Sequence, residues 1–131
     1  MERGEATSNG PHISTTHLGA ALWLLRLEGE HDVSTVARLR EAIEGVFAQG
    51  TCVVLDLSQA TFVDSSVLGE LIRAHNRVAA TRDEKLAVVA PASSAAARLF
   101  DLTGVDDTWF PRFESRTDAL AWSEGAVSGH A

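Results

Sequence analysis

The chain has 131 residues, 45% of them hydrophobic, with a formal net charge of −7 and a pI near 5.1. This length and apolar content predict one domain, and no apolar run reaches the roughly 18 residues that a membrane-spanning helix needs. Because an acidic surface without a basic stripe repels phosphate groups, we do not expect nucleic acid or an anionic membrane as a partner. The single cysteine, Cys52, excludes an internal disulfide, and with an amino terminus unlike a signal peptide it predicts a cytoplasmic protein.

Both ends of the chain are small and polar, which predicts a flexible leader over residues 1–11 and a flexible tail over residues 124–131. Strand and helix patterns alternate over the intervening residues 12–123, which we take as the domain. Strands are expected over 12–17, 21–28, 51–57 and 85–90, with a further extended piece at Trp109-Phe110. Helices are expected between these strands: one capped by Ser34 and ended by Gly50, one from Ser65 to about Ala80, and one begun by Pro91 with Ser93 or Ser94 and closed by Gly104. A last helix should follow a capping box at Ser115–Asp118.

Strand–helix–strand alternation with short links predicts parallel pairing and right-handed crossovers. The turn Leu18-Gly19-Ala20 predicts a hairpin between the first two strands, which makes the first strand antiparallel. The fold class predicted is therefore α/β, with a mixed, mainly parallel sheet of four or five strands and about four helices. The nearly continuous apolar run over 51–57 indicates a central strand buried on both faces.

The three polar residues Asp64-Ser65-Ser66 stand where the strand over 51–57 and its following loop give way to a helix. A plain helix cap needs one such residue, and here there are three in a row. A helix start offers backbone N–H groups and the positive end of a dipole, so it can hold an anion, including a phosphate on its own serine. Val67-Leu68-Gly69 follows in the first turn and is expected to form a small docking surface.

A second polar turn, Gly29-Glu30-His31-Asp32, also ends a strand ahead of a helix. Because parallel strands end at one edge of a sheet, Asp32 and Ser65 are expected to lie on the same edge, where α/β folds place their binding sites.

Other chemistries find less support. His31, His75, Asp32 and Asp64 could serve a serine hydrolase, but the Gly-x-Ser-x-Gly elbow is absent. No paired Cys/His spacing indicates a metal site, and neither a Walker motif nor Gly-x-Gly-x-x-Gly indicates a nucleotide cofactor.

Together these residues resemble the STAS domain, found in anti-sigma factor antagonists and in the cytoplasmic tails of sulfate transporters. The resemblance spans about residues 12–123. Its most specific part is Val53-Val54-Leu55-Asp56-Leu57 followed, after five residues, by Val63-Asp64-Ser65-Ser66-x-Leu68-Gly69. Leu27-x-Gly29-Glu30-x-Asp32 is similar to a second family motif, with His31 where the family has leucine, and Val67 stands where the family has glycine.

The resemblance implies a partner-switching protein with no enzymatic activity and no cofactor. In bacterial antagonists the unmodified domain binds an anti-sigma factor that is itself a serine kinase, phosphorylation of the signature serine ends the complex, and a phosphatase resets it. Carried over, the accepting hydroxyl is that of Ser65, with Ser66 as the alternative, and Asp64 would orient it. The partner-binding residues implied are Asp32, Asp64, Ser66, Val67 and Leu68.

Two further hypotheses stay open. The chain could be a STAS-type docking subunit of a transport or stress-sensing complex whose serines are never modified, or a domain that senses a small ligand or nucleotide at the sheet edge. The sequence leaves the oligomeric state open.

Overall fold

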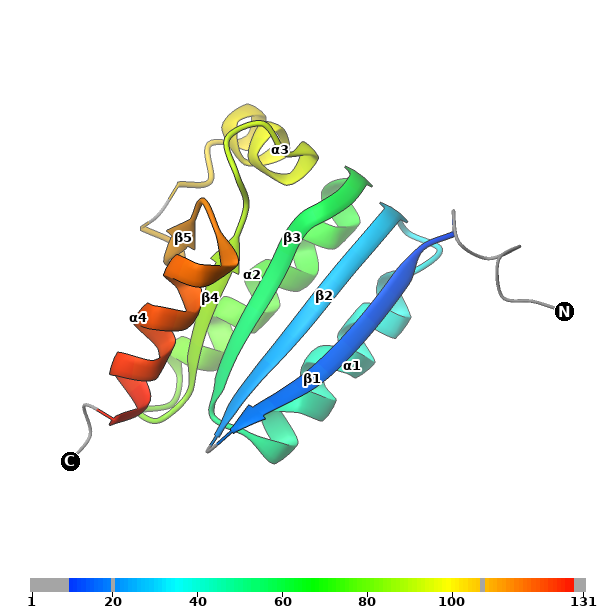
Figure 1. The fold of residues 1–131 in the computed structure, drawn as a ribbon. Helices are drawn as coiled ribbons and strands as arrows, with labels where there is room; N and C mark the ends of the chain where they lie inside the picture. The colour runs from blue at the N-terminus through cyan, green and yellow to red at the C-terminus, as the bar shows by residue number, and fades with distance from the viewer. Residues whose placement is uncertain (1–9, 20, 107, 129–131) are drawn as a thin grey trace, which may run out of the picture.

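The structure, a computed structural model, describes residues 10–19, 21–106 and 108–128. Within them a single sheet is flanked by helices (Figure 1). The elements in chain order are β1 (His12–Gly19), β2 (Leu22–His31), α1 (Val36–Gln49), β3 (Cys52–Val63), α2 (Ser65–Ala79), β4 (Lys85–Val89), α3 (Ala95–Thr103), β5 (Arg112–Phe113) and α4 (Arg116–Ser128).

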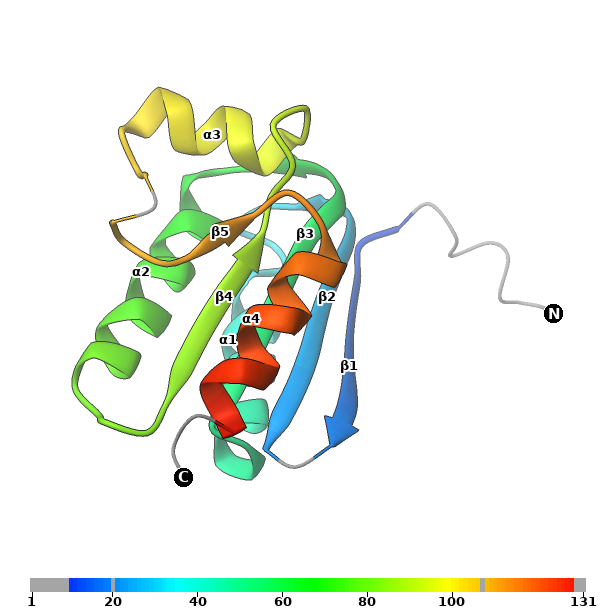
Figure 2. The same cartoon turned by 60° about the vertical axis from the view of Figure 1, so that its left-hand side comes forward.

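The five strands follow one another across the sheet in the order β1-β2-β3-β4-β5. β1 pairs with β2 in the antiparallel sense, and the other neighbours are parallel. Helices α1 and α2 cover one face, α4 covers part of the other, and α3 lies beyond the end of β3 (Figures 1 and 2). The predicted α/β class, the mixed sheet and the antiparallel first strand are therefore confirmed.

Two hydrophobic clusters line the two faces of the sheet. The larger one joins alternate residues of β2 and β3, such as Leu25 and Leu55, to α1, α2 and α3. The smaller one joins the intervening residues, such as Leu24 and Val54, to α4. β3 is thus buried on both faces over its first half, as its apolar run predicted.

Several boundaries differ from the predicted ones. β3 continues six residues beyond Leu57, because shifts in its register with β2 accommodate the polar stretch that follows. The last strand lies at Arg112–Phe113 rather than at Trp109-Phe110, since β5 pairs with the end of β4. α1 has Thr35 at its N-cap instead of Ser34, whose hydroxyl bonds to Asp32.

The last helix also runs further than the sequence patterns indicated. α4 continues to Ser128, so residues 124–128 are helical and not the flexible tail predicted from 124 onward. The helix is held on the sheet by Ala119 and Ser123, which are fully buried. The predicted leader falls mostly on residues 1–9 and the rest of the tail on residues 129–131, which lie outside the described residues.

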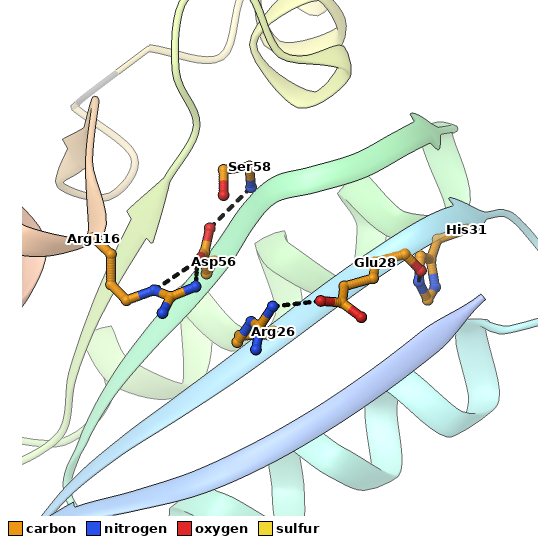
Figure 3. A network of polar contacts seen from close by, with 6 residues as sticks. All are labelled: Arg26, Glu28, His31, Asp56, Ser58 and Arg116. Atoms are coloured by element: carbon orange, nitrogen blue, oxygen red, sulfur yellow. Dashed lines mark hydrogen bonds and ion pairs between the residues drawn. The ribbon is translucent and has the colours of Figure 1, made fainter. Parts of the chain in front are cut away.

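A buried carboxylate fastens α4 to the sheet (Figure 3). Asp56 of β3 is 1% exposed, and its Oδ2 accepts hydrogen bonds from Nε and Nη2 of Arg116 at 3.0 and 2.9 Å. Its Oδ1 accepts the Ser58 backbone N–H at 2.9 Å. Because a buried charge is tolerated only when it is paired, this contact fixes where α4 begins on the sheet.

We expect Arg116→Met to lower the free energy of unfolding by about 2 kcal/mol, because it leaves the Asp56 carboxylate buried without its partner. The effect stays below that of a fully buried pair since the Arg116 side chain is 41% exposed. Urea denaturation measures it. Adding Asp56→Asn should recover part of the loss, and an Arg116→Met variant as stable as wild type would contradict this role.

Candidate functional site

The register of β2 and β3 brings the two polar turns together. His31 and Val63, the last residues of these parallel strands, are paired across the sheet. Asp32 and Asp64 each come one residue later, so both leave the sheet side by side at its carboxyl edge. We call this edge, with residues 30–34 and 62–66, the switch rim. The expectation that Asp32 and the serine pair share one edge is confirmed.

Asp64 is the N-cap of α2, and its carboxylate closes the amino end of that helix. Its Oδ1 accepts the backbone N–H of Ser66 at 3.0 Å and that of Val67 at 3.4 Å. The Ser66 hydroxyl also donates to Oδ1. The first amides of α2 are thus already occupied by a carboxylate, so the site is less open to an anion than the sequence indicated.

The two serines differ in their surroundings. Ser65, the first residue of α2, is exposed, and its hydroxyl has no hydrogen-bond partner among the described residues. Ser66 is half-buried, and its hydroxyl is held by Asp64. The expectation that Asp64 orients the Ser65 hydroxyl is therefore wrong: Asp64 bonds to the hydroxyl two residues on, as the geometry of a capping aspartate favours.

Asp32 forms the same kind of turn on the neighbouring strand. Its Oδ1 accepts the Ser34 backbone N–H at 2.8 Å and the Ser34 hydroxyl at 2.6 Å. These two hydrogen bonds, the hydroxyl first, hold the pKa of Asp32 below its usual value, because they stabilise the charged form. The rim therefore presents two carboxylates that are both fixed by their own serines.

Gly29 explains why the motif before Asp32 contains glycine. Its φ is 86°, a conformation that residues with a side chain rarely adopt. A Cβ at this position would also lie 2.8 Å from the carbonyl oxygen of Gly10. The glycine thus lets the segment before β1 pass close to β2 near the rim.

The predicted apolar docking surface is wrong in its residues. Val67 and Leu68 are 1% and 7% exposed and belong to the large hydrophobic cluster beneath α2. The first turn of the helix points them inward, because α2 packs this side on the sheet. Val67, which stands where the resembling family has glycine, is therefore a core residue and does not alter the surface by its own bulk.

Two other apolar side chains are exposed on the switch rim, although their sequence context does not single them out. Val33 follows Asp32 and is 71% exposed, and Phe62 precedes the Asp64 turn and is 48% exposed. Two sequence features could have indicated their exposure. Val33 is an apolar residue inside a polar turn, and Phe62 alternates with the core residue Val63 along the strand. The rim thus combines fixed carboxylates, an accessible hydroxyl and apolar contact area.

An ion pair orients α2 behind the rim. Glu70, one turn after the serines, is 4% exposed, and its Oε2 accepts hydrogen bonds from Nε and Nη2 of Arg40 at 3.1 and 2.6 Å. Arg73 adds a longer contact at 3.5 Å. The pair links α1 to α2, the two helices that begin at the rim, and it joins residues 30 positions apart, which sequence spacing could not indicate.

His31 is fully buried beneath the rim, where its ring contacts groups of its own turn. Its Nε2 lies 3.0 Å from the Glu28 carbonyl oxygen and its Nδ1 lies 3.1 Å from Thr35 Oγ1, so both ring nitrogens already have partners. The described residues contain no cluster suited to a metal ion and no helix long and apolar enough to cross a membrane.

Comparison with known proteins identifies the family. The STAS domain family model matches residues 12–119, and the chain belongs to this family. An anti-sigma factor antagonist from Mycobacterium paratuberculosis is similar over 89% of this chain and 97% of its own, with 26% identity and a TM-score of 0.78.

Two further solved structures share the fold at lower identity. The Bacillus cell fate determinant SpoIIAA in its phosphorylated form covers 85% of this chain and 98% of its own, with 18% identity and a TM-score of 0.65. A sulfate transporter family protein from Wolinella succinogenes covers 86% and 93%, with 12% identity and a TM-score of 0.70.

The buried His31 predicts how stability depends on pH. Burial is the main cause that lowers its pKa from 6.5 in the folded chain. Below about pH 6.5 the unfolded chain therefore binds more protons than the folded one, and the free energy of unfolding falls as the pH decreases through this window. Urea denaturation between pH 7 and pH 5 should show a smaller fall for His31→Leu than for wild type. An unchanged fall would contradict the assignment to His31.

Proposed function

We propose that this chain is an anti-sigma factor antagonist that acts as a phosphorylatable binding switch without catalytic activity. In its unmodified form it sequesters an anti-sigma factor that is also a serine kinase, and phosphorylation of Ser65 releases that partner. A phosphatase would restore the unmodified form, and the proposed role places the protein in the cytoplasm.

The observation that carries the proposal is the accessible Ser65 hydroxyl at the start of α2, directly after the fixed carboxylate of Asp64 and on the same rim as that of Asp32. The antagonist at 26% identity supports the class of partner. The similar fold of SpoIIAA, whose structure is of a phosphorylated form, supports the kind of modification.

Exposure and hydrogen bonding favour Ser65 over Ser66 as the acceptor. A kinase must reach the hydroxyl and place it in line with the phosphate of its ATP. The Ser65 hydroxyl permits this because it is exposed and has no hydrogen-bond partner in the part of the chain that the structure describes. Modification of Ser66 would require breaking its bond to Asp64, which also caps α2.

A phosphate on Ser65 adds a charge of about −1.5 to −2 at neutral pH. Because the Asp64 carboxylate already occupies the first amides of α2, this charge would meet another negative group rather than free N–H donors. Asp32 adds a second carboxylate on the same rim. A hundredfold loss of affinity for a partner docked here corresponds to about 2.7 kcal/mol of binding free energy. Like-charge repulsion in a contact without water can supply this amount.

The rim also indicates what the partner surface contains. Val33 and Phe62 offer exposed apolar area on the same rim as the carboxylates, so the complementary surface combines apolar and basic side chains. This arrangement fits a protein better than a small ligand, which would need a concave site.

A second candidate is a docking subunit whose serines are never modified. This candidate is supported by the fold that the chain shares with the sulfate transporter family protein from Wolinella succinogenes. Under that candidate the same rim binds a transporter or scaffold protein, and the Ser65 hydroxyl contributes only a hydrogen bond.

We expect protein isolated from its native cells to carry one phosphate, on Ser65, detected by mass spectrometry of the peptide that contains residues 64–66. Ser65→Ala should abolish the modification because it removes the acceptor. Ser66→Ala, the matched control, should retain it. Phosphate on Ser66 in both wild type and Ser65→Ala would contradict the choice of residue, and unmodified serines in a complex with transporter or scaffold proteins would favour the second candidate.

We expect Phe62→Ser to weaken binding of the co-purified kinase by about tenfold. The substitution removes the exposed part of the Phe62 ring, roughly half of the side chain, which a bound partner would bury. Leu18→Ser is the control, since Leu18 has a similar exposure, 42%, and lies near the end of β1 beside the start of β2, away from the rim. Titration calorimetry with unmodified protein gives both affinities. Equal losses in the two variants would contradict a specific role for Phe62.

A further inference from the structure

The outer side of β1 is the open edge of the sheet. β1 is the first strand in the sheet order, and no described strand pairs with its other side. Figure 2 shows it along one border of the molecule, with β2 as its neighbour. All eight residues are exposed except Ile13, which is half-buried.

β1 lacks the features that usually keep strand edges apart. Residues 12–19 contain no Lys, Arg, Asp, Glu or Pro, and the irregularity in pairing lies only near the end, between His17 and Gly19. The opposite edge differs, because β5 is only two residues long. One edge of this sheet is thus protected, and the other is suited to strand pairing.

We propose that β1 pairs with β1 of a second copy of this chain. The two strands would be antiparallel and related by a two-fold axis perpendicular to the sheet. In such a pair, residues that face each other point to the same side of the sheet. The axis can therefore lie between the two copies of Thr15, which then face each other. Ser14 then faces Thr16 of the other copy, and Ile13 faces His17. Hydroxyl pairs, and pairs of a β-branched side chain with an aromatic ring, stabilise neighbouring strands.

Charge favours a second copy at this edge over the basic partner proposed for the switch rim. With a net charge of −7, two copies repel over most approaches. β1 has no acidic side chain, and the nearest charged pair behind it, Arg26 with Glu28, is internally neutralised. The strand therefore lets two acidic copies approach without opposed charges, while it offers nothing that attracts a basic surface.

The proposed pairing leaves both switch rims accessible. It joins two five-stranded sheets into one continuous sheet. The rim consists of residues that follow β2 and β3, and none of them belongs to the paired strand β1, so the pairing does not cover the Ser65 hydroxyl. Because the two β1 strands are antiparallel, the rims face opposite ends of the assembly, and one dimer can bind two partner molecules.

The experiment is sedimentation equilibrium of the full, unmodified chain from about 1 to about 500 µM, because self-association depends on concentration. The mass should rise from 14.0 kDa toward twice that value. Thr15→Lys should weaken the dimer at least about tenfold, since it places two ammonium groups opposite each other. Thr117→Lys is the control, because it makes the same change at an exposed position of α4 and should leave the association unchanged.

Cross-linking tests the register. Thr15→Cys should form a disulfide between copies on mild oxidation, since the axis places the two thiols side by side. Thr117→Cys should not, and Cys52 of the native chain is buried.

A chain that stays at 14.0 kDa throughout, or a dimer that Thr15→Lys does not weaken, would overturn the proposal. A further result would also overturn it: the full chain is monomeric, but a variant lacking residues 1–9 dimerises. That result would mean that the chain's own leader binds the β1 edge. None of these measurements involves Ser65, so their failure leaves the proposed switch untouched.

Discussion

The parallel pairing of β2 with β3 is the interaction on which the rest of the site depends. It sets His31 opposite Val63, and so the chain leaves both strands at one edge and turns immediately at an aspartate. Each aspartate then accepts hydrogen bonds from the backbone and hydroxyl of the serine two residues later, Asp32 from Ser34 and Asp64 from Ser66. One strand pairing thus produces two fixed carboxylates next to an accessible hydroxyl.

Charged groups in the interior keep the helices in place around this pairing. Asp56 receives Arg116 and holds the start of α4 on one face of the sheet (Figure 3). Glu70 receives Arg40 and links α2 to α1 on the other face. Both carboxylates are nearly inaccessible, and both arginines are partly exposed, so each pair lowers the penalty of a buried charge without removing the cation fully from water.

The surface divides into parts with different physical character. The switch rim has negative charge, apolar area and a hydroxyl that can take more charge, which suits binding that phosphorylation can end. The β1 edge is uncharged and exposes backbone hydrogen-bonding groups, which suits pairing with an identical strand. Because these surfaces lie on different strands, a change of charge at one does not oppose contact at the other.

The sequence by itself determined the alternation of strands and helices, the hairpin at the start and the shared edge of Asp32 and Ser65, because hydrophobic periodicity and turn residues are local signals. It did not reveal that Val67 and Leu68 are core residues, that Phe62 and Val33 are exposed, or that Asp64 holds Ser66 and not Ser65. Nor could it pair Glu70 with Arg40 or extend β3 to Val63. Those features depend on which face of an element meets a neighbour distant in the chain, and only the packed tertiary structure decides that.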